Sequence, residues 1–327
     1  SVVGLPAPVV ARRKNRERLA WVAAAAAAAA ATLFAVGFVL RAPEQPPQMR
    51  FEILPPAELS FVGSPRISPD GRIVAFFGTD DTGITRIWLR PMDSMEARPL
   101  PGTETTVDTR PFWSPDSKHI GFFTGSKLKR IPVDGGPSQT VCDANGADGT
   151  WSTTGEILYD GSANDPIHGV AAGGGIPKPV VEVDAEAGQT SLGWPEFLPD
   201  GRRFLYQVSS GGGERSLMLG EIGSDEATFL VEADSRVQYV EPGYLLYVRE
   251  ETLVAQPFNA RSGEITGEPR PLADQVGAST VGLADFSASR KGILAYRAEV
   301  GIDVRQLVWR DRAGKNIGVV GEPSMHG

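Results

Sequence analysis

The sequence predicts an all-β protein, a β-propeller of about six four-stranded blades preceded by one transmembrane α-helix. A tight turn followed by an apolar strand recurs along the chain, and a recurrence near 40 residues is typical of propeller blades. Glycine and proline, 38 and 26 of 327 residues, are frequent enough to join many short strands. Near the N-terminus, residues 19–40 carry no charge.

The uncharged stretch 19–40 predicts the transmembrane helix. A helix rises about 1.5 Å per residue, so this stretch reaches roughly 33 Å, enough for the apolar core of a bilayer. Residues 23–31 are all alanine, so the drive to insert comes from the flanking aliphatic and aromatic residues. A signal peptide, which has a shorter apolar core, and an alanine-rich soluble helix are the alternatives.

Charge is distributed unevenly along the chain. The net charge is −8, yet residues 1–18 carry about +4. The positive-inside rule then predicts that 1–18 is a basic cytoplasmic juxtamembrane segment. It predicts a single-pass protein of the inner or plasma membrane, with everything after the span periplasmic or extracellular. Residues 41–50 form a Pro-rich linker. The acidic remainder argues against nucleic acid as a partner. Because the first residue is Ser1, we expect a fragment.

The recurring turn predicts the blades over residues 51–327. Proline fixes φ at the first turn position, aspartate bonds its own backbone, and glycine adopts positive φ. The turn prolines lie 46, 84 and 43 residues apart, the second gap spanning two units, so about six units fit. The expected structural turn residues are Pro69, Asp70, Gly71, Pro115, Asp116, Pro199, Asp200, Gly201, Pro242 and Gly243.

The turn aspartates are interpreted as structural rather than catalytic, because each lies in a turn that needs it. We expect no catalytic, cofactor-binding or metal-binding residue in this protein, and no cofactor. The three histidines show no metal-ligand spacing, and the single cysteine, Cys142, rules out an internal disulfide. A flat β-sandwich is the alternative fold, and the regular four-strand period favours the propeller.

Longer strings resemble a known family. Trp113-Ser114-Pro115-Asp116-Ser117 and Trp194-Pro195-Glu196-Phe197-Leu198-Pro199-Asp200-Gly201 are among them, with residues 96–103, 128–137 and 307–315. They resemble the extracytoplasmic TolB-like, WD-repeat-like propeller of bacterial receptor-type serine/threonine protein kinases, over nearly everything from Phe51 onward. The resemblance implies a sensor or protein-interaction module for a protein or peptide of the cell envelope, preceded by a cytoplasmic kinase domain.

The catalytic parts of a kinase do not occur in this sequence. It has no Gly-rich phosphate loop, H-R-D motif or D-F-G motif, so we expect this protein not to be an enzyme. Two other functions stay open. The propeller could gate a hydrolase or peptidase, or it could be a TolB-like envelope interaction protein without a signalling role. Ring closure by six blades, with or without the strand Phe51–Leu54, also stays open.

Overall fold

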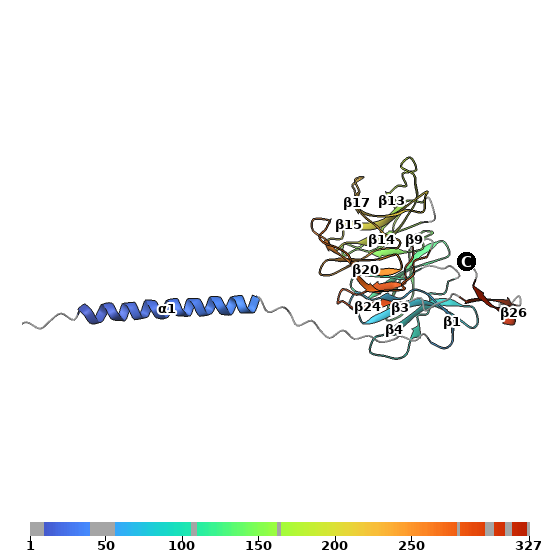
Figure 1. The fold of residues 1–327 in the computed structure, drawn as a ribbon. Coiled ribbons are helices and arrows are strands. Elements are labelled where there is room, and N and C mark those ends of the chain that lie inside the picture. The colour runs from blue at the N-terminus through green and yellow to red at the C-terminus, as the bar shows by residue number, and fades with distance from the viewer. Residues whose placement is uncertain are drawn as a thin grey trace, which may run out of the picture. The chain divides into compact units, whose positions relative to one another are not determined.

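The computed structural model describes residues 10–39, 56–105, 110–161, 165–279, 282–297, 304–310 and 316–325. The chain divides into two units, Ser1–Leu54 and Pro55–Gly327. The first contains one helix, and the second contains all the strands (Figure 1). The predicted strand Phe51–Leu54 and the linker 41–50 lie outside the described residues.

The single helix of the described residues, α1 (Val10–Val39), corrects the prediction for the N-terminal segment. It begins nine residues before the predicted span and so includes basic residues. Within the described residues, no helix combines the length and the apolarity that crossing a membrane requires.

Five antiparallel sheets of four or five strands form the blades, and the first two lie before residue 145. Blade 1 contains β1 (Leu59–Val62), β2 (Arg66–Ile67), β3 (Ile73–Asp80), β4 (Thr85–Pro91) and β5 (Arg98–Pro99). Blade 2 contains β6 (Phe112–Trp113), β7 (His119–Thr124), β8 (Lys127–Pro132) and β9 (Gln139–Asp143).

Blades 3 to 5 repeat this order with antiparallel pairing; consecutive strands pair, except that β22 of blade 5 pairs with β20. Blade 3 contains β10 (Gly149–Trp151), β11 (Glu156–Tyr159), β12 (Ile167–Ala171) and β13 (Lys178–Val181). Blade 4 contains β14 (Gln189–Phe197), β15 (Arg203–Ser210), β16 (Arg215–Glu221) and β17 (Thr228–Glu232). Blade 5 contains β18 (Gln238–Val240), β19 (Tyr244–Arg249), β20 (Thr252–Asn259), β21 (Glu264–Ile265) and β22 (Arg270–Ala273).

The expected sixth four-stranded blade is not formed, so the propeller has five blades rather than six. At the sixth position, β23 (Phe286–Ala288) and β24 (Leu294–Tyr296) make a two-stranded sheet. The strands expected to extend it, β25 (Val304–Arg310) and β26 (Asn316–Met325), pair with each other and with no other described strand. The prediction of about six four-stranded blades is therefore wrong, because the described strands of the sixth unit form two separate two-stranded sheets.

The two-stranded sheet nevertheless lies between the first and last complete blades. The amide of Ile67 in β2 donates a hydrogen bond to Ser287 Oγ in β23 at 3.0 Å. On the other side, the amide of Ala288 donates to Gln238 Oε1 of β18 at 2.8 Å. The strands that precede the repeated turns, β2, β6, β10, β14, β18 and β23, contact one another in succession and thus form a ring with six positions. We call them the inner strands.

The hydrophobic core lies between neighbouring blades. Phe77 and Leu89 of blade 1, for example, pack with Ile120 and Phe122 of blade 2, and all four are buried. Similar clusters join each blade to the next, as far as the two-stranded sheet. Burying one such residue contributes about 1.5–3 kcal/mol, so these interfaces hold the ring together and fix the turns that follow its inner strands.

Candidate binding site in the central pocket

The repeated turns connect each inner strand to the next strand of its repeat. In the first, the amide of Gly71 donates to the carbonyl of Ser68 at 2.8 Å, and Gly71 has φ of 74°. Asp70 Oδ1 accepts from Ser68 Oγ at 2.6 Å and from the Arg72 amide at 3.1 Å. The side chain of Asp70 is therefore occupied by the backbone and hydroxyl of its own turn.

The other turns keep this geometry with partly different residues. Asp116 accepts from Ser114 Oγ and the Lys118 amide, with Ser117 at φ 62° where the first turn has glycine. Asp200 accepts from the amides of Arg202 and Arg203 at 2.9 Å.

The turns of blades 3 and 5 depart from this pattern. In blade 3, the hydroxyls of Ser152 and Thr154 share a hydrogen bond of 2.8 Å. In blade 5, Pro242 follows a cis peptide bond, and the amide of Gly243 donates to Val240 O at 3.1 Å.

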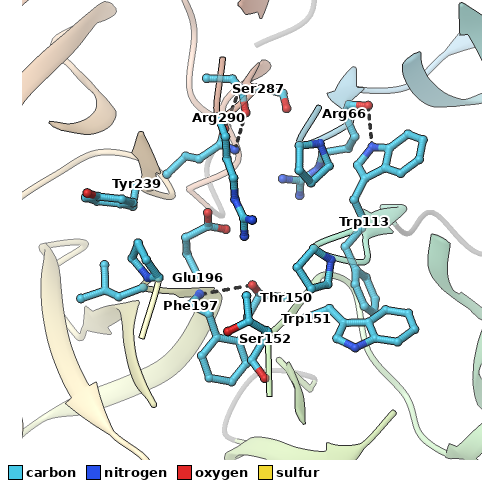
Figure 2. A pocket seen from close by; sticks show the side chains of 18 of the residues that line it. Arg66, Trp113, Thr150, Trp151, Ser152, Glu196, Phe197, Tyr239, Ser287 and Arg290 are labelled. Atoms are coloured by element: carbon cyan, nitrogen blue, oxygen red, sulfur yellow. Dashed lines mark hydrogen bonds between the residues drawn. The ribbon is translucent and has the colours of Figure 1, made fainter. Parts of the chain in front are cut away.

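A pocket of about 120 Å³ opens among these turns and the inner strands. Its lining includes turn residues such as Pro69, Pro115 and Pro199, together with the aromatic residues Trp151 and Tyr239. Every one of the six ring positions contributes to it, so we call it the central pocket. Figure 2 shows the side chains that surround it.

One equivalent position of the repeat supplies a central-pocket residue from each inner strand. It is the second position before the turn, and its occupants are Arg66, Phe112, Thr150, Glu196, Gln238 and Ser287. At three of these positions the side chain accepts a hydrogen bond from a backbone amide of the next inner strand. The amide of Phe197 donates to Thr150, that of Ala288 to Gln238, and that of Ile67 to Ser287. These three side chains therefore link neighbouring inner strands.

Glu196 departs from that pattern. Its carboxylate has no hydrogen bond or ion pair within the part of the protein that the structure describes, and it points into the pocket (Figure 2). A bulge in β14 between Gly193 and Glu196, with Trp194 at φ 56°, sets its direction. Three ring positions away stands Arg66, so a carboxylate and a guanidinium belong to opposite sides of the ring.

Beside the pocket, Arg66 is held by a buried ion pair. Arg66 Nη2 donates to Asp148 Oδ2, and the two side chains are 11% and 5% exposed. Arg236, 3% exposed, lies over the Phe286 ring at 4.4 Å and donates from Nε to Ala284 O at 3.2 Å. Its Nη2 has no hydrogen-bond partner among the described residues.

Burial and charge shift several pKa values here. Burial raises the pKa of Glu196 to about 7, against the opposing effect of Arg236 and Arg66. Burial, followed by the charge of Asp148, raises the pKa of Asp160 to about 7. Asp160 also accepts the amides of Asp148 and Trp194 at 2.8 and 3.2 Å. By contrast, the hydrogen bond from Ser114 lowers the pKa of Asp116 in its turn.

Sequence reasoning placed the turn residues but did not single out the charged residues of the central pocket. The prolines Pro69, Pro115 and Pro199 line it, whereas Asp70, Asp116 and Asp200 do not. In the sequence, Glu196 belongs to the string Trp194–Gly201, which resembles the family, and no other motif distinguishes it. The signal that could have found it is a charged residue two positions before the turn, where other repeats have phenylalanine, threonine, glutamine or serine. Among the described residues, no group of three or more potential metal ligands lies together.

Comparisons with known proteins address the fold. No protein-family model and no curated protein matches the chain. Among solved structures, TolB from Acinetobacter baumannii is similar with a TM-score of 0.51 at 14% identity, covering 65% of this chain and 55% of that one. The fold is a TolB-like β-propeller. This chain thus spans little more than half of that TolB structure.

Two further solved structures are similar at lower scores. Putative TolB from Agrobacterium tumefaciens has a TM-score of 0.46 at 16% identity, covering 54% of this chain and 67% of that one. The β-propeller domain of the trilobed protease from Pyrococcus furiosus also has a TM-score of 0.46 at 16% identity, covering 70% and 75%.

Proposed function

We propose that this protein is a binding module, a TolB-like propeller that recognises a protein or peptide of the cell envelope at its central pocket. The observation that carries the proposal is the unpaired carboxylate of Glu196, which faces a pocket lined from all six ring positions. A carboxylate that faces a pocket and whose pKa is raised by desolvation is a candidate for a role in recognition. Propeller folds alone do not specify function, and the proposal therefore rests on this site.

A photo-crosslinking residue tests the site. Thr153 is exposed and lines the central pocket, whereas Phe229 is 55% exposed on the outer strand β17. With the photoreactive residue at position 153, we expect a discrete adduct with an envelope protein, and position 229 is the matched control. Adducts from position 229 alone would contradict binding at the pocket.

We further propose that the module is extracytoplasmic and belongs to a serine/threonine protein kinase whose activity it regulates. The basic segment 1–18 and the family-like strings support this proposal. Protease added to intact cells, or to spheroplasts if the propeller is periplasmic, should degrade the propeller. The coding sequence upstream of Ser1 should encode a kinase domain, and a hydrolase domain encoded downstream of Gly327 would instead favour the gating function.

A further inference from the structure

The charge balance of the central pocket determines what kind of group it can receive. Of the charged groups that face Glu196 from other ring positions, Arg66 and Asp148 neutralise one another as an ion pair. Arg236 and Arg290 remain. The exposed carboxylate of Glu241 also lines the pocket, so two cations stand against two carboxylates, those of Glu196 and Glu241. The pocket is therefore balanced in charge when Glu196 is ionised and becomes cationic when Glu196 is protonated.

Arg290 is the cation that a ligand can reach. It follows Ser289 in the turn of the two-stranded sheet, and its amide donates to the carbonyl of Pro69 at 3.1 Å, which fixes its backbone against blade 1. Its side chain is exposed, lines the pocket and points into it (Figure 2). Within the described residues, its guanidinium makes no hydrogen bond and no ion pair. Five N–H donors are thus available at the pocket opening.

We propose that the central pocket binds a carboxylate group of its peptide ligand through Arg290. The group is an acidic side chain or a peptide C-terminus, both of which match the planar guanidinium in a two-pronged hydrogen bond. This inference rests on the proposed function, since it names the chemistry recognised at the same site. The volume of about 120 Å³ suits one such group rather than a folded segment.

Glu196 makes this recognition depend on pH. When ionised, it repels an incoming carboxylate, and when protonated, it can donate a hydrogen bond to one. Since the raised pKa of Glu196 lies near 7, carboxylate binding should be several-fold weaker at pH 8 than at pH 6. The buried cation Arg236 favours the same anion from behind the pocket.

Small model compounds test the proposal by isothermal titration calorimetry. N-acetylaspartate α-amide offers only the carboxylate of an aspartate side group, and N-acetylalanine offers only a terminal one. N-acetylalaninamide offers neither, and alaninamide offers an ammonium group. We expect one or both carboxylates to bind, and the preferred one identifies the source. Binding of alaninamide but not of the carboxylates, or no binding by any compound, would overturn the proposal.

Variants locate the binding. Arg290→Gln should weaken carboxylate binding at least tenfold, whereas Lys291→Gln should change it less than twofold. Lys291 is an exposed cation of the same turn outside the pocket lining, so this control removes the same charge. Equal losses of carboxylate affinity in both variants would mean that the two cations act only by long-range electrostatic attraction. That result would overturn the assignment of Arg290 as the binding residue. Glu196→Gln should strengthen binding at pH 8 and remove its dependence on pH.

Failure of this inference is distinguishable from failure of the proposed function. If the carboxylates do not bind but crosslinking from position 153 persists, the pocket recognises another group. If crosslinking is also lost, the binding function itself is contradicted.

Discussion

Asp116 of blade 2 and Glu196 of blade 4 occupy neighbouring positions of the repeat unit, yet their surroundings are opposite. Asp116 lies in a turn that satisfies it with a hydroxyl and an amide, and its pKa is lowered. Glu196 stands two positions before its turn, without a partner among the described residues, and its pKa is raised. The difference shows that the aspartate of the repeated turn is held by its own turn, whereas the glutamate at a position where other repeats differ has no such partner among the described residues.

The largest expected effect is a loss of stability when one partner of the buried Arg66–Asp148 ion pair is removed, compared with removal of the unpaired Glu196. Asp148→Ala leaves Arg66 buried without its partner, so the free energy of unfolding should fall by about 3–5 kcal/mol. Urea denaturation followed by fluorescence measures it. Glu196→Ala, which breaks no ion pair, should cost much less. A comparable loss from both variants would break the distinction between the two carboxylates.

A smaller effect is expected at the turns. Asp116→Ala removes two hydrogen bonds and should lower the free energy of unfolding by about 1–2 kcal/mol. Asp134→Ala is the matched control, because Asp134 is exposed and should stay within about 0.5 kcal/mol of the parent protein. Carboxylate binding should be unchanged in Asp116→Ala, and its loss would contradict the structural interpretation of the turn.

The smallest effect is in the dependence of stability on pH. A carboxylate whose folded pKa is raised binds its proton more tightly when folded, so stability falls as pH rises from about 4.5 to about 7. Asp160 contributes in the same direction from 3.8 upward. Glu196→Gln should therefore show a shallower decline between pH 5 and pH 8 than the parent protein. Identical pH profiles of stability for the two proteins would mean that the pKa of Glu196 is the same in the folded and unfolded states, which would contradict the prediction.

The local parts of this molecule could be predicted from the sequence because they depend on local chemistry. Proline, aspartate and glycine at fixed offsets produce the turns at Pro69 and Pro199, and an apolar run such as Ile73–Phe77 forms the strand that follows. The blade number could not be predicted, because β25 and β26 carry strand-forming residues whichever strand they pair with. Similarly, the alanine-rich stretch predicts a helix well, because alanine has the highest helix propensity, and α1 includes it.

The candidate site depended on relationships that the sequence does not display directly. A bulge in β14 sets the direction of the Glu196 side chain. Which side chains lie close enough to pair with it, and that none of the described ones does, depends on how the six inner strands are arranged around the pocket. Arg66 and Asp148 are 82 positions apart in the sequence, and only the closed ring brings them together. Comparing the same position across all repeats recovers part of this information, since it singles out Arg66 and Glu196 as charged exceptions.

The two-stranded sheet at the sixth position makes the junction between blades 5 and 1 smaller than the others; we call this junction the seam. At every other junction a complete blade stands on both sides, whereas here only two strands fill the position. Hydrogen bonds of Ser287 and Gln238 join β23 to β2 and β18, and an apolar cluster packs β23 against blade 5. Arg66 and Arg290 stand on the two sides of that seam, and both line the central pocket. A ligand bound between these two residues would therefore join the two sides of this junction, and it would stabilise the folded propeller increasingly as its concentration rises above its Kd.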